Sequence, residues 1–452
     1  MTLSPYWSDG TVSLHLGDCL EVLAEMEAAS VDAVVTDPPY ALSFMGRDWD
    51  SFSAGAIRSR VDQRTNPAKG KSVTSTPEAY IAGHPFQSWC EQWARECLRV
   101  LKPGGHMLAF GGTRTWHRLT CAIEDAGFEI RETVADLTGI DGPGLLWLHG
   151  QGFPKSRNVS KAIDSLLGAE RPVVETIPDR WAGKGDVLQR ATQDKRSEAH
   201  ITASATAAAA AAEGWGTALK PAWEPVVVAR KPLSGTVAQN FMEHGTGALN
   251  IAGCQVATSP GDDIYAKNPH THGGFGHGDA QVYGEGNGSD YTPRDGRWPP
   301  NAALGADAAS ELDRQSGVTA SRIGRPRAGR PGDGYGMTHT GTEYADTGGA
   351  SRFFPVFRYE PKAAAAERPR GEDGTAHPTV KPVDLMAWLV RLVTPPGGLV
   401  LDPFAGSGTT AEACIVEGFR CVLVEKDPAY AELIRTRLRK DIQPAMFGEV
   451  TA

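Results

Sequence analysis

Apolar runs and stretches with helical spacing alternate over much of the chain, and this pattern predicts its secondary structure. Residues 11–36 predict a strand, a helix and a second strand, "VDAVVT", whose β-branched run is typical of a strand buried on both faces. An amphipathic helix at 85–105 and a buried strand at 106–112 follow, and then a helix and further strands up to residue 150. Strands that alternate with helices favour an α/β layer built on a parallel sheet.

The alternation stops after residue 150 and returns near residue 376. Residues 151–214 contain one predicted helix and the alanine run "ASATAAAAAAEG", which is typical of a surface helix or a tether. The segment "PAWEPVVVARKP" predicts a strand that rejoins the sheet, and a long irregular stretch rich in Gly, Asp, Asn, His and Pro follows it. Such a stretch in a compact enzyme is usually functional or disordered. We therefore divide the chain into segments 1–150, 151–214, 215–232, 233–350 and 351–452.

A glycine-rich turn joins two predicted strands in "LVLDPFAGSGTTAEACIVEGFRCVLVEKD" (399–427), which is half of a nucleotide-binding α/β unit. Gly406 and Gly408 would let the backbone approach a ligand that a Cβ atom would exclude. Glu425, at the tip of the second strand, could accept hydrogen bonds from ribose hydroxyls. Because the spacing G-x-G-x-x-G is absent and Asp402 precedes the turn, a nucleoside with a positive amino-acid tail, such as S-adenosylmethionine, suits it better than a pyrophosphate. A generic tight turn between strand and helix is the alternative.

Another predicted strand ends in "TDPPY", which places Asp37, Pro38, Pro39 and Tyr40 at its carboxyl end. Open α/β sheets bind ligands at that edge. The prolines fix φ and stiffen the turn, while the Asp37 carboxylate and a proline carbonyl can both accept hydrogen bonds from one exocyclic amine. Tyr40 offers a face on which an extruded base can stack. The alternative is an ordinary Asp-Pro turn beside a core tyrosine.

Composition and charge limit the classes of protein that fit. The chain has 452 residues, a net charge of −9 and seven scattered cysteines without a CxxC pair. An acidic total disfavours a histone-like binder of nucleic acid but leaves room for a local basic cleft. The free cysteines, and the lack of a membrane-length apolar run or a secretory leader, lead us to expect a cytoplasmic protein with no membrane partner.

The segments "TDPPY", "DPFAGSGTT" and "HPTVKP" (377–382) together resemble the DNA amino-methyltransferases, which methylate N6 of adenine or N4 of cytosine. The resemblance covers about residues 11–150, 215–232 and 352–452, and the DPPY turn precedes the cofactor loop as in the permuted beta group of that family. It implies a Rossmann-like, S-adenosylmethionine-dependent methyltransferase fold of the α/β class, circularly permuted, with an irregular inserted target-recognition region at 233–350. Such a permutation is tolerated because domain termini often lie close together.

The resemblance also implies roles for individual residues. Asp37, Pro38 and Tyr40 would hold the target amine and base, on a turn that Pro39 stiffens. Asp18 and Cys19 would meet the adenine of the cofactor, Glu425 its ribose, and His377, Thr379 and Lys381 its methionine end. Simpler explanations remain, since Cys19 suits a small buried site, Lys381 a solvated helix start and the threonines helix capping. The full cofactor set is Asp18, Cys19, His377, Thr379, Lys381, Asp402, Phe404, Gly406, Gly408, Thr409, Thr410 and Glu425.

Two basic stretches are candidates for contact with DNA phosphates. The first is a loop after the DPPY turn, and the second is a Gly/Pro-rich stretch that resembles a groove-inserting arm. A solvated loop and a disordered linker are the alternatives. Base-specific contacts are expected from 233–350, and the histidines of "NPHTHGGFGHGD" lack cysteine partners at finger spacing, so we expect no metal site. The arginines concerned are Arg58, Arg60, Arg64, Arg322, Arg325, Arg327 and Arg330.

These observations predict a site-specific DNA methyltransferase that uses S-adenosylmethionine and acts on a flipped base, at N6 of adenine in preference to N4 of cytosine. The acid in the DPPY turn carries that preference, since a serine is more typical of cytosine enzymes. In-line transfer needs no metal and no covalent intermediate, and the absence of a Pro-Cys pair disfavours methylation of cytosine C5. An RNA methyltransferase and a non-catalytic nucleic-acid-binding protein remain alternatives. Double-stranded DNA is the expected partner, while a homodimer and a separate restriction nuclease stay open.

Overall fold

The computed structural model describes residues 4–41, 83–137, 158–178, 198–216, 223–257, 296–320, 347–357, 377 and 380–439. The chain divides into two compact units. Unit 1 combines Met1–His149 with Trp223–Ala452, and unit 2 is the intervening Gly150–Ala222. Unit 2 is therefore an insertion into the chain of unit 1.

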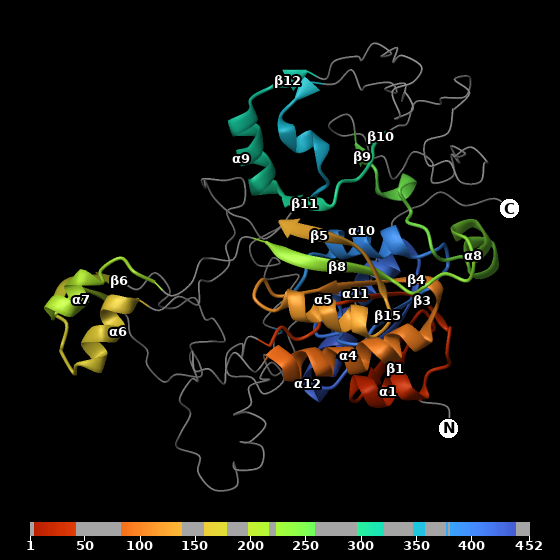
Figure 1. Ribbon diagram of the computed structural model, residues 1–452, viewed down its shortest axis with the longest axis horizontal. Helices are drawn as coiled ribbons and strands as arrows, with labels where there is room; N and C mark the ends of the chain where they lie inside the picture. Colours follow the sequence, from red (N-terminus) through yellow and green to blue (C-terminus); the bar gives the residue numbers. More distant parts are fainter. Residues whose placement is uncertain are drawn as a thin grey trace, which may run out of the picture. The chain divides into compact units, whose positions relative to one another are not determined.

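A ten-stranded sheet runs through unit 1 in the order β1-β2-β16-β15-β3-β4-β8-β5-β11-β14 (Figure 1). Strands β2, β16, β15, β3 and β4 are parallel, whereas β8 is antiparallel to both of its neighbours and β1 is antiparallel to β2. Strands β5, β11 and β14 again run parallel to one another. The strands are β1 (Trp7–Ser8), β2 (Val12–Leu16), β3 (Val31–Thr36), β4 (Leu101–Phe110), β5 (Glu129–Leu137), β8 (Glu224–Arg230), β11 (Ala302–Gly305), β14 (Val356–Phe357), β15 (Leu399–Asp402) and β16 (Arg420–Glu425).

Helices cover both faces of this sheet because its central strands are apolar on both sides. Helices α10, α11 and α12 share one core with Leu14 and Val35, and α1, α4 and α5 share the other with Val34 and Met107 (Figure 1). In the described part of the chain, no helix is long and apolar enough to cross a membrane. The helices are α1 (Cys19–Glu25), α4 (Gly83–Val100), α5 (Trp116–Asp125), α10 (Val383–Val393), α11 (Thr409–Glu417) and α12 (Pro428–Leu438).

The structure corrects two expectations from the sequence. The sheet is mixed rather than parallel, because β8 enters it in the opposite direction. The helix predicted at 85–105 ends at Val100, and β4 begins at once at Leu101. The Lys-Pro-Gly-Gly segment fits inside this strand as a bulge, since the register against β3 shifts there and Gly104 takes a φ of +74°.

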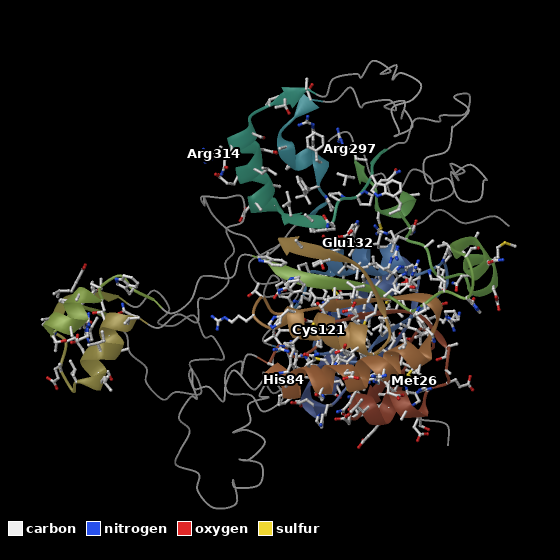
Figure 2. All side chains as sticks on the ribbon, viewed as in Figure 1. Met26, His84, Cys121, Glu132, Arg297 and Arg314 are labelled. Atoms are coloured by element: carbon white, nitrogen blue, oxygen red, sulfur yellow. The ribbon has the colours of Figure 1, made fainter. Side chains whose placement is uncertain are left out.

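Part of the stretch predicted to be irregular belongs to the same sheet. Strand β11 of this stretch pairs with β5 and extends the sheet, and β14, which follows the stretch, pairs with β11 at the edge. Helix α9 (Ala306–Ser316) packs beside the 3-10 helix η4 (Ala350–Phe353), where Asp313 accepts hydrogen bonds from Ser351. Figure 2 shows Arg314 on α9 and Arg297 near η4, where the Arg297 guanidinium lies 4.9 Å from the centre of the Phe353 ring. Small alanines carry this packing, and so the sequence shows little apolar periodicity here.

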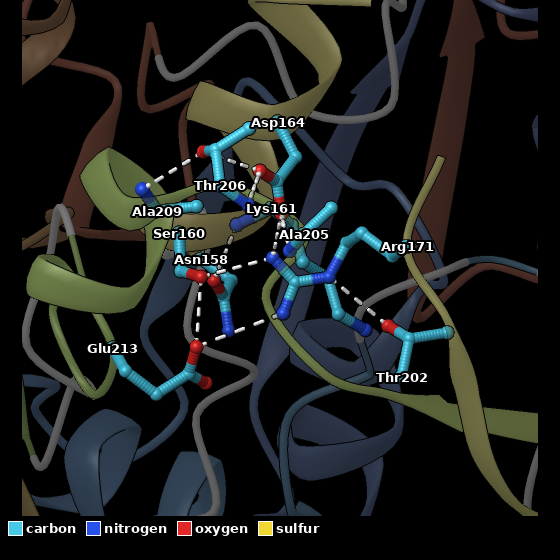
Figure 3. Close-up of polar contacts among 10 residues, drawn as sticks. All are labelled: Asn158, Ser160, Lys161, Asp164, Arg171, Thr202, Ala205, Thr206, Ala209 and Glu213. Carbon is cyan, nitrogen blue, oxygen red and sulfur yellow. Dashed lines mark hydrogen bonds and ion pairs between the residues drawn. The ribbon is translucent and has the colours of Figure 1, made fainter. Parts of the chain in front are cut away.

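In the part of unit 2 that the structure describes, a charged pair of Asp164 and Arg171 joins the elements. Arg171 donates hydrogen bonds to Asp164 over 2.6 Å, to Ser160 over 2.9 Å and to Thr202 over 3.1 Å (Figure 3). The alanine run forms a short helix that Thr206 caps, and a hairpin that the sequence did not predict completes the unit. Its elements are α6 (Val159–Leu166), β6 (Val173–Pro178), β7 (Glu198–Thr202) and α7 (Ala207–Ala211).

Candidate active site

The turn at residues 37–40 and the glycine-rich loop at 403–408 lie side by side because the strands before them pair. In this pairing Val400 of β15 faces Ala33 of β3. The chain leads from β15 to its neighbour β16 on one side, and from β3 to its neighbour β4 on the other side. The strand order therefore changes direction between β15 and β3, and open α/β sheets bind ligands at the carboxyl edge of such a switch point. The two segments are also joined directly, because the Thr36 hydroxyl donates to Asp402 Oδ1 over 2.7 Å.

The turn at 37–40 is held by its own side chains and by the loop after β4. The Tyr40 hydroxyl donates to Asp37 Oδ1 over 2.6 Å, and Thr115 Oγ1 donates to the Tyr40 carbonyl over 2.7 Å. A Cβ atom at Gly112 would lie 3.1 Å from the Tyr40 ring, so the loop approaches the ring as closely as glycine allows. Ala41 has a φ of +56°, a left-handed conformation that costs such a residue about 1 kcal/mol. Backbone strain of this kind is typical of functional sites.

A cation from the C-terminal half of the chain reaches this turn. Lys381 Nζ lies 3.4 Å from Asp37 Oδ2 and donates to the Tyr40 hydroxyl over 3.0 Å. A closer partner is Glu224, because Lys381 Nζ donates to Glu224 Oε2 over 2.5 Å. Glu224 opens β8, and because β8 is antiparallel to β4, its amino end lies at the edge where the parallel strands have their carboxyl ends. The sequence did not identify Glu224, which is the first residue of a strand that was expected to run parallel to the others.

Two glycines with positive φ shape the loop at 403–408. Gly406 has a φ of +52° and Gly408 a φ of +77°, where a residue with a Cβ atom is strained. The atoms that a Cβ would meet belong to the protein itself, His377 Nε2 at 3.0 Å from Gly406 and the Ile434 side chain at 3.1 Å from Gly408. The need for glycine at both positions is thus explained by backbone conformation and packing within the chain.

Glu425 ends β16 beside this loop. Its Oε2 accepts a hydrogen bond from the Gly406 N–H and its Oε1 one from the Asp427 N–H, each over 2.8 Å. Burial raises the pKa of Glu425 to about 7, although these N–H groups oppose the shift. The Glu425 carboxyl group therefore changes charge near neutral pH. Its ionised form can accept further hydrogen bonds.

Asp18 follows β2, the strand next to β16 in the sheet. It caps α1 by accepting from the Leu20 N–H, and Lys426 Nζ lies 2.9 Å from its Oδ2. Burial alone would raise the pKa of Asp18, but the bonds from Lys426 and Leu20 hold the pKa below its usual value. The next residue, Cys19, is buried, and burial raises the pKa of its thiol to about 12, so that it stays neutral.

Asp402 shapes the loop from inside the protein. Its side chain accepts hydrogen bonds from the Thr36 hydroxyl, the Phe404 N–H and the Thr410 hydroxyl at 2.6 to 3.0 Å. Burial raises the pKa of Asp402 to about 6 in spite of these hydrogen bonds. The carboxylate therefore ties β3, the loop and the first turn of α11 together.

A buried arginine on α12 clamps the other end of the loop. Arg437 Nη1 donates to the Ser407 carbonyl and to Thr409 Oγ1, each over 3.1 Å, and its Nε pairs with Glu412. The sequence did not identify Arg437, because a basic residue in an amphipathic helix usually faces water. The sequence feature that could have indicated its burial is its helical spacing, which places Arg437 on the same face of α12 as the apolar Ile434 and Leu438.

Two aromatic contacts frame the loop. The Phe404 ring packs against Trp93 and Trp89 of α4, with ring centres 5.3 and 5.5 Å apart. The His377 ring lies edge-on to Tyr430, with ring centres 4.7 Å apart. The loop residues predicted to line the cofactor pocket are thus brought together with an apolar wall beside them.

Several predicted residues lie outside the part of the chain that the structure describes. Within the described ranges, no group of three or more His, Cys, Asp or Glu side chains could hold a metal ion. The residues outside are Thr379, the arginines Arg58, Arg60, Arg64, Arg322, Arg325, Arg327 and Arg330, and the histidines His270, His272 and His277.

The residues at this edge fit S-adenosylmethionine by their chemistry. Glu425 and Asp18 end adjacent strands and offer carboxylate acceptors to hydroxyl and amino groups, while Phe404 offers an apolar ring. Asp37, at the end of the next strand but one from Glu425, adds negative charge that suits a sulfonium and an ammonium group. These side chains could hold a charged nucleoside without a metal.

A family match covers most of the chain. Residues 31–436 match the N6/N4 methyltransferase model of the DNA methylase family. The type II methyltransferase M.HindIII of Haemophilus influenzae is 23% identical over 248 residues, which are 52% of this chain and 64% of that protein. The type II methyltransferase M.HinfI of Haemophilus influenzae is 26% identical over 118 residues, 26% of this chain and 29% of that protein. The matches thus span less than two thirds of either relative.

Solved structures of DNA methyltransferases align with nearly the whole chain at low identity. The PvuII DNA methyltransferase, whose name specifies cytosine N4, aligns with 98% of this chain and 91% of its own. The identity is 14% and the TM-score 0.43.

Proposed function

The chain belongs to the N6/N4 DNA methylase family, and on this premise we propose that it methylates the exocyclic amine of a base in double-stranded DNA, at N6 of adenine. Methyltransferases of this family take the methyl group from S-adenosylmethionine. The observation that carries the proposal is the position of Asp37. Its carboxylate stands at the carboxyl edge of the sheet, one strand from the glycine-rich loop, and its side chain is 24% exposed.

The side chains of the turn suit the activation of an amine. An exocyclic amine is conjugated with its ring, so its nitrogen is a poor nucleophile until hydrogen-bond acceptors draw on both N–H groups. Asp37 Oδ2 and the Pro38 carbonyl would be those acceptors, while Tyr40 Oη binds Asp37 Oδ1 and fixes the carboxylate. Bound S-adenosylmethionine would supply a methyl group on a positively charged sulfur. Placing the amine beside it, with its lone pair facing the methyl carbon, accounts for most of the expected acceleration.

The cofactor would lie at the edge between Asp18, Glu425 and Phe404. Glu425 would accept hydrogen bonds from ribose hydroxyls, and Asp18 would meet the adenine, with Cys19 as a neutral, close-packed neighbour. His377 and the loop glycines would border the methionine end. Thr409 and Thr410 would act indirectly, since Arg437 and Asp402 hold their hydroxyl groups.

The choice of adenine rests on the acid that opens the turn. A serine at this place is more typical of N4-cytosine enzymes, and the N4-cytosine activity is the second candidate. Because M.HindIII and M.HinfI are type II methyltransferases, we also place this protein in restriction and modification of DNA, in the cytoplasm. Its DNA phosphates would be met by the arginines at 58–64 and 322–330, and its bases by the segment 233–350.

The proposal is tested by labelling DNA and identifying the labelled nucleoside. The purified full chain is incubated with tritiated S-adenosylmethionine and unmethylated genomic DNA, and the DNA is then digested to nucleosides. Labelled N6-methyldeoxyadenosine is the expected product. Labelled N4-methyldeoxycytidine would keep the chemistry and change the target base. Label that enters RNA alone, or no label in the presence of measured cofactor binding, would overturn the proposal.

A further inference from the structure

Two carboxylates compete for one lysine at the catalytic edge. Lys381 Nζ lies 2.5 Å from Glu224 Oε2 but 3.4 Å from Asp37 Oδ2. The first distance is that of a strong hydrogen bond between charged groups, whereas the second is an ion pair longer than a good hydrogen bond. The lysine is therefore held mainly by Glu224, although it is close enough to reach Asp37.

The surroundings leave the lysine few other positions. Its side chain is only 12% exposed, and its Nζ lies 4.3 Å from the centre of the Phe110 ring and 3.0 Å from the Tyr40 hydroxyl. Burying a charge without a partner is costly, so an ammonium in this place needs a carboxylate. Among the carboxylates that the structure describes, Asp37 would be in place to take over if Glu224 lost its charge.

Such a shift would block the proposed chemistry. Asp37 Oδ1 already accepts a hydrogen bond from Tyr40, and so Oδ2 is the oxygen on which the target amine depends. A lysine that moved onto Oδ2 would occupy that acceptor. It would also place a positive charge beside the amine nitrogen, which itself becomes positive as it takes the methyl group and stays so until one of its protons leaves. Both effects slow the transfer step more than the binding of either substrate.

We infer that Glu224 is a positioning residue for methyl transfer, which holds Lys381 away from Asp37 and keeps the charge of the site negative. The inference rests on the proposed function, since it assumes that Asp37 accepts from the target amine. Asp37, Glu224 and Lys381 carry a net charge of about −1 when all are ionised, and without Glu224 the net charge would be about zero. Glu224 acts through Lys381 and has no need to touch the DNA or the cofactor.

The chain offers a matched control at the other end of β8, where Glu129 of the neighbouring strand β5 pairs with Arg230. The pair is 2.6 Å long, and the Glu129 side chain is 40% exposed, compared with 41% for Glu224. Glu224→Gln and Glu129→Gln therefore remove the same charge, at the same exposure, from ion pairs of similar length. We expect Glu224→Gln to lower the single-turnover rate about 10- to 100-fold, with the Kd for S-adenosylmethionine within about twofold of the parent protein. Glu129→Gln should keep the parent rate.

A second pair of variants separates positioning from a general effect on the fold. Lys381→Met removes the cation, so adding Glu224→Gln to it should cause no further loss of rate, whereas independent effects would multiply. Equal rates for Glu224→Gln and Glu129→Gln would overturn the inference, and so would an equal loss from Glu224→Gln in the presence and absence of Lys381. If the parent protein labels no DNA, the proposed function fails instead. If it labels DNA and Glu224→Gln does too at full rate, only the role of Glu224 fails.

Discussion

Two clusters of charged residues, one in each unit, use the same chemistry for different ends. In unit 2, Asp164 and Arg171 pair at 2.6 Å, and their side chains are 1% and 10% exposed. At the edge of the sheet in unit 1 where we propose catalysis, Lys381 lies between Asp37 and Glu224, and both carboxylates keep part of their surface in contact with solvent. The first cluster is closed, and the second is open in that it is partly exposed.

The origin of the contacts explains this difference. Asp164 accepts from the backbone of Ala205, from Thr206 and from Arg171, all of which belong to unit 2. Burial would raise its pKa, but these hydrogen bonds hold the pKa of Asp164 below its usual value, so it stays ionised inside the unit. Asp37, Glu224 and Lys381 come from three distant parts of the chain. A closed cluster stabilises a small unit from within, whereas an open cluster leaves acceptor oxygens for a ligand.

The largest expected effect separates these two roles. Asp37→Asn removes the negative charge and replaces one of the two acceptor oxygens with an NH2 donor. The single-turnover rate should therefore fall on the order of 1000-fold, while the Tm stays near that of the parent protein. Asp164→Asn should do the reverse. It should raise hydrogen exchange across 158–216 and leave the Kd for S-adenosylmethionine unchanged. A full methylation rate for Asp37→Asn, or equal loss of structure in both variants, would contradict the comparison.

The second prediction tests a closed cluster that supports the site. Arg437→Met leaves Glu412 and the Ser407 carbonyl without their partner and loosens the glycine-rich loop, so the unfolding free energy should fall by roughly 3 kcal/mol. The Kd for S-adenosylmethionine, measured by calorimetry, should rise about 10- to 100-fold. Arg435→Met is the control, because Arg435 pairs with Glu432 on the same helix at the surface. Unchanged cofactor binding in Arg437→Met would contradict the idea that Arg437 holds the glycine-rich loop in the conformation that binds S-adenosylmethionine.

The sequence predicted the turn with Asp37 and the glycine-rich loop, but it did not predict the residues that hold them, Glu224 and Arg437. Asp37 and the glycine-rich loop follow apolar strands and carry turn residues, so pattern and turn chemistry place both at one edge of a sheet. Glu224 escaped because the direction of β8 is set by tertiary pairing and not by its own residues. Arg437 escaped because a buried arginine in a helix looks like a surface one until its partners are known. In unit 2 the helix α6 was predicted, whereas the strands β6 and β7 were not, because their pairing joins two short segments through tertiary contacts.

The third prediction concerns pH. Burial raises the pKa of Glu425 to about 7, and the ionised form is the stronger acceptor for ribose hydroxyls. Affinity for S-adenosylmethionine should therefore be greatest above pH 7 and fall roughly tenfold between pH 8 and pH 6, as the carboxylate takes up a proton. Glu425→Gln should bind more weakly at pH 8 and lose most of this dependence. Any titration of S-adenosylmethionine itself affects the parent protein and Glu425→Gln alike. If the Kd changes with pH equally in both proteins, the pH dependence therefore comes from the cofactor and not from Glu425.

The smallest expected effect probes how tightly the open cluster is held. A Cβ atom at Gly112 would lie 3.1 to 3.2 Å from three carbons of Tyr40, so the Tyr40 side chain must give way by a few tenths of an ångström. Because the Tyr40 hydroxyl fixes Asp37 Oδ1, Gly112→Ala should tilt the acceptor and lower the methyl-transfer rate about 3- to 10-fold, with cofactor affinity unchanged. Gly348→Ala is the control, since its Cβ would make an ordinary 3.4 Å contact with a flexible arginine side chain. If Gly112→Ala and Gly348→Ala methylate at the same rate, the turn at 37–40 tolerates a displaced Tyr40 ring. The open cluster of Asp37, Glu224 and Lys381 would then depend less on exact side-chain positions than the closed cluster of unit 2.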